Sequence, residues 1–136
     1  MMSEREFPNT LKLDCGPVTA VDLSLYAAAS GDHNPLHLDD SVALSAGFDR
    51  PIVHGMLSMA YVGRLLTETF GVGAVVFLHT RFTGIAKRGQ TLKLQANLDR
   101  TENDLGHYKI TVLNEDGQEL VVGVAHIRWP KLKHVK

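Results

Sequence analysis

A run of chemically active side chains occupies residues Ser30 to Asp40 of this 136-residue chain. The run, SGDHNPLHLDD, contains two histidines, three aspartates, an asparagine and a proline. A carboxylate and an imidazole held side by side can position a water molecule and transfer its protons, so Asp32 and His37 are candidate acid–base groups. The structural alternative is an aspartate that caps the turn and a histidine that is hydrogen-bonded in the core. The residues alone leave both interpretations open.

A metal site is a second interpretation of the same run. The candidate ligands are His33, His37, Asp39, Asp40 and His54. Two ligands four residues apart share one face of a helix, but Pro35 forbids a regular helix between His33 and His37. We therefore expect no metal at this run.

The residues His54-Gly55-Met56 open an apolar segment that we expect to be a helix. The first N–H groups of a helix have no partner within it, and the positive end of its dipole lies there. Such groups can stabilise an oxyanion, and a ligand can approach the backbone closely at Gly55 because glycine has no Cβ. Alternatively, Gly55 only relieves crowding against a sheet. With the acid–base pair nearby, the oxyanion interpretation favours chemistry next to a carbonyl.

Other motifs are weaker. Ser58 does not lie in a GxSxG turn, and Cys15 has no paired base nearby in sequence, so both are expected to be structural. The stretch GVGAVV from Gly71 runs from a helix into a strand and lacks a third glycine. A dinucleotide-binding loop runs from strand to helix, so we interpret Gly71 as the end of a helix.

Composition excludes several classes of protein. A net charge of -1 argues against a nucleic-acid-binding protein, and the single cysteine excludes an intramolecular disulfide. No segment approaches the ~18 apolar residues of a membrane span, and the polar N-terminus has no apolar signal segment. We expect a single domain over residues 1–136, in a bacterial cytoplasm or in an organelle matrix.

Periodicity predicts the helices that carry these residues. Thr19 begins a helix with Asp22 as a capping partner, and this helix ends at Ser30-Gly31. Its predicted buried face consists of Val21, Leu25, Tyr26 and Ala29. A short helix is expected over residues 38–46. Residues 56–66 carry one charge, Arg64, and a helix that is apolar nearly all round should be buried all round.

The rest of the chain predicts strands. We expect strands at residues 11–15, 74–82, 91–99, 108–112 and 120–129, with a hairpin turn at Asn114 to Gly117. Residues 120–129 are apolar on both faces, as in an interior strand or a strand at a subunit interface. This order predicts an α+β fold in which a curved antiparallel sheet wraps around one central helix.

The combination of SGDHNPLHLDD, PIVHGML and a glycine-containing apolar helix resembles the MaoC-like hydratases and dehydratases. These hot-dog-fold proteins include (R)-specific enoyl-CoA hydratases, and the resemblance covers roughly residues 25–82. It implies that Asp32 and His37 are catalytic, that Asn34 helps to hold the loop and that the Gly55 N–H polarises a thioester carbonyl. It gives His54 a supporting role. Some members carry a hydroxyl-bearing residue where Gly63 stands here, and Ser58 is a partial substitute.

The resemblance also implies a reaction. This reaction is the reversible syn hydration of trans-2-enoyl thioesters, carried on coenzyme A or an acyl carrier protein, to (R)-3-hydroxyacyl thioesters. It requires no metal or redox cofactor. The patterns HFPxxPxxPG and Asp followed by HxNN, typical of other hot-dog dehydratases and thioesterases, are absent from the sequence. A hot-dog thioesterase and a non-catalytic partner subunit of a heteromeric dehydratase are the alternatives.

Three further expectations concern binding. Arg81, Lys87 and Arg88 form a basic cluster that would meet the phosphates of coenzyme A or an acidic carrier protein, unless it is an ordinary solvated loop. Tyr61, Leu65 and Phe77 are candidates to line an acyl pocket. The two-faced strand near Val122, together with the resemblance, predicts a homodimer that joins two sheets.

Overall fold

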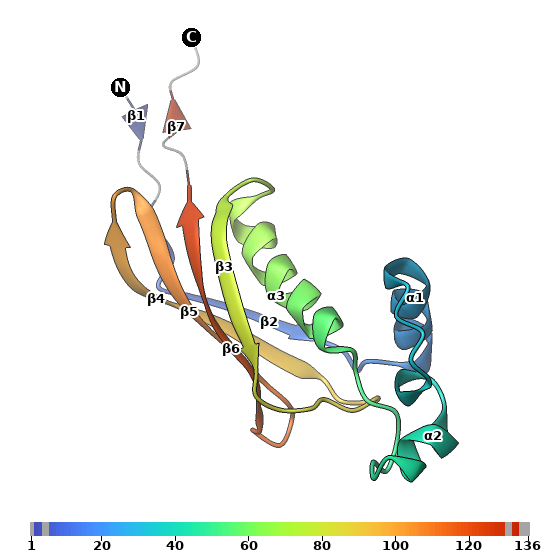
Figure 1. Ribbon diagram of the computed structural model, residues 1–136. Coiled ribbons are helices and arrows are strands. Elements are labelled where there is room, and N and C mark those ends of the chain that lie inside the picture. Colours follow the sequence, from blue (N-terminus) through green and yellow to red (C-terminus); the bar gives the residue numbers. More distant parts are fainter. Residues whose placement is uncertain (1, 4–5, 130–131, 134–136) are drawn as a thin grey trace.

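A computed structural model of the chain describes residues 2–3, 6–129 and 132–133. Within these residues, a curved antiparallel sheet wraps around one long helix, α3 (Gly55–Phe70) (Figure 1). The sheet has the strand order β2-β4-β5-β6-β3. Its strands are β2 (Thr10–Cys15), β4 (Leu92–Glu102), β5 (Leu105–Leu113), β6 (Glu119–Arg128) and β3 (Val75–Phe82). This arrangement confirms the predicted α+β hot-dog fold.

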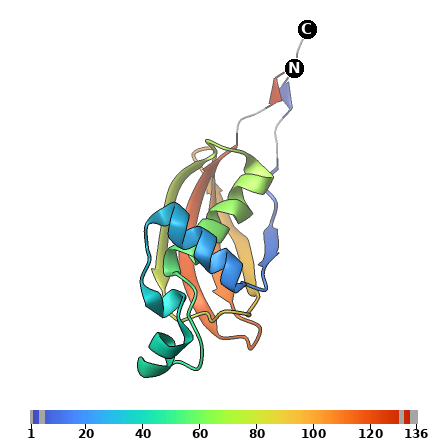
Figure 2. The same ribbon diagram turned by 90° about the vertical axis from the view of Figure 1, so that its right-hand side faces the viewer.

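The segment between β2 and α3 carries the shorter helices. These are α1 (Ala20–Ser30), the 3₁₀ turn η1 (Pro35–His37) and α2 (Asp40–Ser45). Figure 2 shows that α1 lies on the side of α3 away from the sheet. Two short strands, β1 (Met2–Ser3) and β7 (Leu132–Lys133), pair with each other outside the main sheet. None of the described helices is long and apolar enough to cross a membrane.

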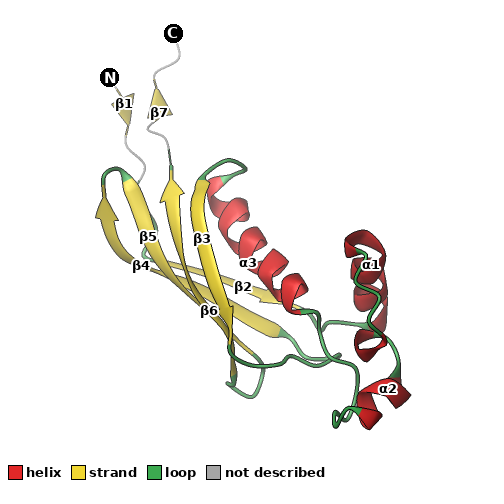
Figure 3. Ribbon diagram, in the orientation of Figure 1, coloured by secondary structure: helices red, strands yellow, loops and turns green. Residues whose placement is uncertain are grey.

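The two faces of the sheet differ in composition, as the alternation along the strands predicts. The inner face packs against α3, and its buried residues include Leu11, Cys15, Leu92, Leu94, Ala96, Tyr108, Ile110, Val112, Ala125 and Ile127. Figure 3 shows the long helices on this side of the sheet only. The outer face carries mostly polar side chains, and no helix in the described part of the chain covers it.

The start and end of α1 are confirmed, but of its predicted buried face only Tyr26 packs against the core, and it is half-buried. Thr19 and Asp22 form a capping box, and Gly31 ends the helix in the left-handed conformation. The buried residues are Leu23 and Ala27, whereas Val21 and Leu25 are 66% and 64% exposed. Apolar side chains occur at helical spacing on both faces of α1, so spacing alone does not determine which face meets the core.

Helix α3 was expected to be buried all round, and this is wrong for one face. Leu57, Val62 and Leu66 are buried against the sheet, but Met56 is 57% exposed and Ala60 is also exposed. The sheet of one chain wraps only one side of the helix, and α1 covers only part of the other. Gly71 ends α3, as predicted.

The short helix expected over residues 38–46 is present as α2, which begins at Asp40 because the Asp39 side chain caps it by accepting from the N–H groups of Ser41 and Val42. The two-faced strand near Val122 is β6, which lies between β5 and β3, so the interior alternative is confirmed. An interior strand has no free edge, so β6 cannot join two sheets edge to edge. The edge strands of the sheet are β2 and β3. The turn at Asn114 to Gly117 is confirmed.

Candidate active site

Short-range hydrogen bonds shape the loop that follows α1. Ser30 Oγ accepts from the N–H of Asp32 (3.1 Å), and Asp32 Oδ1 accepts from the N–H of Asn34 (3.2 Å). Asn34 Oδ1 then accepts from the N–H of Leu36 (3.0 Å). Each bond joins a side-chain oxygen to the N–H two residues later, as in Asx and related turns. Asn34 therefore holds the loop with its side-chain oxygen.

This loop brings Asp32 to His37. The distance from Asp32 Oδ2 to His37 Nε2 is 3.8 Å, which is too long for a direct hydrogen bond. His37 Nδ1 lies 2.9 Å from the carbonyl oxygen of Ile52. Because a carbonyl only accepts, Nδ1 carries the proton and Nε2 of the neutral ring keeps its lone pair. Two acceptors, one carboxylate and one imidazole, therefore face each other with a gap that a water molecule can bridge.

His54 contacts both members of this pair. Its Nε2 donates to the backbone carbonyl of Asp32 (3.1 Å), and its ring stacks on His37 with centroids 3.8 Å apart and an interplanar angle of 21°. Tyr26 of α1 meets the ring edge-on, with centroids 4.9 Å apart. His54 is 2% exposed, and its Nδ1 has no hydrogen-bond partner among the described residues. Burial lowers the pKa of His54, although its hydrogen bond to Asp32 acts in the opposite direction, so the neutral ring is favoured.

The N-terminus of α3 adds backbone donors. The N–H groups of Leu57 and Ser58 both bind the carbonyl of His54, at 3.0 and 3.3 Å. The N–H of Gly55 has no partner within the described part of the chain. A Cβ added at Gly55 would lie 3.4 Å from the ring of Phe82, which is a tight contact. The donor and the crowding interpretations of Gly55 therefore both have support.

A pocket of about 250 Å³ joins these groups. Its lining residues are His37, Ile52, Val53, Gly55, Ser58, Phe82, Gly84, Ile85, Ala86, Leu120 and Val121. His37, Gly55 and Ser58 form one polar part, and the other residues are apolar or glycine. An apolar cavity of about 150 Å³ holds a benzene molecule, so this pocket has room for a short acyl group beside the polar residues.

None of the residues expected to line an acyl pocket lines this pocket. Leu65 is part of the main core, and Tyr61 is half-buried on the same helix. Phe77 lies on the outer face of the sheet, stacked on His126 with centroids 4.7 Å apart. Only the first turn of α3 reaches the pocket, through Gly55 and Ser58.

The pocket wall that the sequence reasoning missed comes mainly from the β3–β4 connection and the start of β6. The sequence feature that could have indicated this wall is Gly84. A Cβ at this position would collide with the carbonyl oxygen of Glu119, so only glycine lets the β3–β4 connection approach β6 this closely. Phe82 and Ile85 flank this glycine, and both line the pocket and are exposed.

The expected basic cluster is divided between two places. Arg81 points from β3 to the outer face, where it lines a hollow with His79 and Lys109. Lys87 binds Asp49 (2.8 Å), and Arg88 makes a two-pronged contact with Asp40 (2.7 and 3.1 Å); these four residues also lie outside the pocket lining. Lys87 is nevertheless next to the pocket, because it forms a β-bridge with Ile52.

Three of the candidate metal ligands, His33, Asp39 and Asp40, lie apart from the acid–base pair. Asp39 caps α2, Asp40 binds Arg88, and His33 is exposed. The structure instead brings one donor atom each of Asp32, His37 and His54 within 4.8 Å of one another. Nε2 of His54 already binds the carbonyl of Asp32, and Asp32 supplies the only carboxylate of the three. We therefore interpret the group as an acid–base site.

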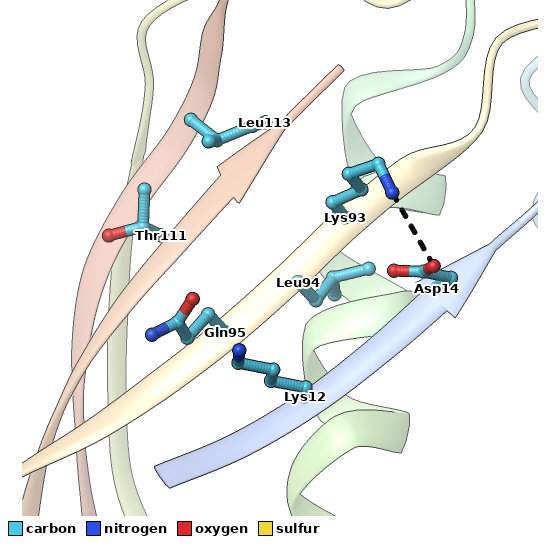
Figure 4. Close-up of a pocket in the computed structure, with 7 residues that line it drawn as sticks. All are labelled: Lys12, Asp14, Lys93, Leu94, Gln95, Thr111 and Leu113. Carbon is cyan, nitrogen blue, oxygen red and sulfur yellow. Dashed lines mark ion pairs between the residues drawn. The ribbon is translucent and has the colours of Figure 1, made fainter. Parts of the chain in front are cut away.

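A larger hollow on the outer face offers a contrast. Figure 4 shows its polar side chains on the face of β2, β4 and β5 away from α3. Its volume is about 340 Å³, and its lining residues are Lys12, Asp14, Lys93, Leu94, Gln95, Thr111 and Leu113. Asp14 and Lys93 form an ion pair across it (3.6 Å). The lining contains no histidine and no helix N-terminus, so we assign it no chemistry.

Comparison with known proteins agrees with this geometry. Residues 5–118 match the MaoC-like domain model. The (R)-specific enoyl-CoA hydratase of Aeromonas caviae is 32% identical over 97 residues, which cover 71% of this chain and 65% of that protein. The 3-hydroxyacyl-thioester dehydratase Y of Mycobacterium tuberculosis is 35% identical over 105 residues, which cover 74% of this chain and 36% of that protein.

A solved structure extends the match to the fold. The (R)-hydratase from A. caviae superposes with a TM-score of 0.84 at 26% identity, covering 93% of this chain and 98% of that one. The chain therefore belongs to the MaoC-like domain family. It spans less than two thirds of the length of both curated relatives described above.

Proposed function

We propose that this protein catalyses the reversible syn hydration of trans-2-enoyl thioesters to (R)-3-hydroxyacyl thioesters, with the acyl group carried on coenzyme A or an acyl carrier protein. Family membership and relatives named as hydratases and dehydratases support the general reaction. The observation that carries the proposal is the facing pair of acceptors, Asp32 Oδ2 and His37 Nε2, 3.8 Å apart beside the pocket.

In the proposed hydration, Asp32 and His37 hold one water molecule by accepting hydrogen bonds from its two O–H groups. Its oxygen attacks C3 of the enoyl group while one of the two residues removes a proton. The C2–C3 double bond opens toward the thioester, and C2 then receives a proton on the same face from the acid–base pair. Such assistance typically contributes 10²–10⁴-fold, on the order of 3–5 kcal/mol. Dehydration is the same path in reverse.

The negative charge that develops on the thioester oxygen needs a donor. The unpaired N–H of Gly55, at the positive end of the α3 dipole, is suited to this role. Ser58 lies one turn further along α3 and lines the same pocket. We propose that Ser58 contacts the substrate and that Asn34 acts only by holding the loop. No step uses a metal or a redox cofactor.

A hydration assay across acyl lengths, on both carriers, tests the proposal. Loss of the enoyl-thioester absorbance with formation of the (R)-3-hydroxyacyl product is expected, and dialysis against a chelator should leave the rate unchanged. Release of free thiol would instead identify a thioesterase. A purified chain that neither hydrates nor hydrolyses would favour a partner subunit of a heteromeric dehydratase.

We also propose a homodimer. β3 is an edge strand of the sheet, and edge strands present unpaired N–H and C=O groups that favour pairing with another chain. Large exposed apolar side chains gather on or near this edge, namely Val76, Phe82, Ile85 and Met56. Two copies paired through β3 would cover this surface and the mouth of the pocket. Light scattering after size exclusion should give twice the chain mass, and a monomer mass would contradict the proposal.

A further inference from the structure

We propose that His54 is a positioning residue, which couples the acid–base loop to the N-terminus of α3 and so sets the geometry of Asp32 and His37. This inference rests on the proposed hydratase function. His54 does not line the pocket, so it is not expected to touch the substrate. Instead, His54 contacts both the loop that carries Asp32 and His37 and the first turn of α3.

The first contact is with the loop. Nε2 of His54 donates to the carbonyl of Asp32, which fixes the backbone of the residue whose carboxylate faces His37. The ring of His54 also stacks on the ring of His37 and thereby limits its tilt. Asp32 and His37 are therefore both held by one imidazole.

The second contact is with the helix. His54 is the residue before Gly55, and its own carbonyl accepts from the N–H groups of Leu57 and Ser58. The backbone of His54 thus fixes where α3 begins, while its ring holds the loop. A shift of the loop relative to the Gly55 N–H would require breaking one of these contacts. Misplacement of a reacting group by about 1 Å can cost ~100-fold in rate, so such a coupling matters for catalysis.

A purely structural role does not account for a histidine at this position. Nδ1 is buried without a partner among the described residues, and an unpaired buried polar nitrogen is destabilising. A phenylalanine ring would fill the same space between Tyr26 and His37 without that nitrogen. The carbonyl of Asp32 belongs to an exposed residue, so water can replace the lost donor. The ring nitrogen is thus best explained by the orientation that it gives to Asp32.

Two substitutions separate the hydrogen bond from the ring. His54→Phe keeps a stacking ring and removes the donor, whereas His54→Gln keeps an N–H donor at a similar reach and removes the ring. We expect His54→Phe to lower kcat by ~10–100-fold with little change in KM, while its Tm equals or exceeds that of the unsubstituted protein. His54→Gln should recover part of the lost kcat. His79→Phe is the matched control, because His79 lies on the outer face of the sheet in the hollow lined by Arg81 and Lys109.

Amide hydrogen exchange at Asn34 and Leu36, whose N–H groups are bonded within the loop, gives a readout that does not depend on activity. Loss of the donor should let the loop move, so exchange at these two amides should speed up in His54→Phe and return toward that of the unsubstituted protein in His54→Gln. If the unsubstituted protein hydrates no enoyl thioester, the proposed function fails, but the exchange rates still test the contact. Unchanged kcat and unchanged exchange in His54→Phe would overturn the inference. If His54→Phe and His54→Gln lose kcat to the same extent, and both also lower Tm, His54 is only a packing residue. This outcome would also overturn the inference.

Discussion

Two pairs of neighbouring histidines lie on opposite sides of the sheet, with similar spacing but different surroundings. His37 and His54 have ring centroids 3.8 Å apart on the inner side, and His107 and His126 have centroids 4.1 Å apart on the outer face. Backbone carbonyls hold one nitrogen of each inner ring. The outer residues are half-buried, and their pairing is a contact between the rings themselves.

The difference shows what defines the site. Proximity of two imidazoles, and even a lowered pKa, are common to both faces, because burial lowers the pKa of His126 as it does that of His54. The inner pair is distinguished by fixed ring nitrogens, a facing carboxylate and an adjoining pocket with a helix N-terminus. Pocket volume does not identify the site, because two hollows on the outer face, of about 340 and 370 Å³, are larger than the inner pocket of about 250 Å³.

The largest expected effect is the loss of the inner acid–base pair. Asp32→Asn and His37→Gln should each lower kcat for hydration of crotonyl-CoA by ~10²–10⁴-fold, since each replaces a group that can take up and release a proton with an amide that cannot. The amide oxygen introduced by Asp32→Asn can still accept from the N–H of Asn34, so the loop should keep its shape. The same substitution at the outer pair, His107→Gln and His126→Gln, should leave the rate unchanged. Near-normal activity of either inner variant would contradict the assignment.

The next effect concerns the backbone donor of the inner site. Gly55→Pro deletes the N–H at the first position of α3, where proline is tolerated, and His54 already has the extended ψ of 130° that precedes a proline. We expect kcat to fall by ~10²–10³-fold. Gly55→Ala keeps the N–H but adds a Cβ against Phe82, so it measures the effect of crowding. If both variants lose the same activity, the donor role is wrong and crowding explains Gly55.

A smaller effect is expected from the basic residues. Lys87→Glu and Arg88→Glu should raise KM for an acyl-CoA several-fold more than they lower kcat, because Lys87 adjoins the pocket and its charge would meet the carrier phosphates. Arg81→Glu, on the outer face, is the control and should leave KM unchanged. If only Arg81→Glu raises KM, the carrier binds at the outer face and the proposed role of Lys87 is wrong.

The smallest effect is a pH dependence of stability. The pKa of His54 lies below its ordinary value of about 6.5, so between these two values the unfolded chain binds a proton that the folded chain does not. Stability therefore decreases as the pH falls below about 7, even though Asp32 adjoins the ring and opposes this effect. His54→Phe should show a smaller drop in Tm between pH 7.5 and about pH 5.5. His126→Phe should change this drop less, because its ring is more exposed.

The fold followed from local patterns, and the exceptions have a physical reason. Alternation located the strands, and Thr19, Gly31 and Gly71 marked helix ends because capping depends on neighbouring residues. The buried face of α1 depends on what packs against it, and Val21 and Leu23 are equally apolar. The sequence alone therefore could not decide between them.

The same division applies to the site. Asp32, His37 and Gly55 lie in short motifs, and their spacing and the family resemblance identified them. The apolar wall combines residues from segments far apart in sequence, such as Val53, Ile85 and Leu120. Their meeting depends on how β6 and the β3–β4 connection approach each other, which no local pattern encodes. His54 was assigned a supporting role, but its stacking on His37 required the folded geometry.

The turns of the Ser30 to Leu36 loop have a consequence for how the molecule assembles. Three of its hydrogen bonds join a side-chain oxygen to the N–H two residues later, whereas the Tyr108 hydroxyl binds the carbonyl of Pro8 across 100 residues. Closing a short loop costs less chain entropy and takes less time than closing a long one. We therefore expect the loop to take its shape early in folding, before the sheet closes around α3. The turns of the loop are in this sense local, so another scaffold could host the loop only if it also supplied a carbonyl to hold His37, a donor for the Asp32 carbonyl and a helix N-terminus beside them.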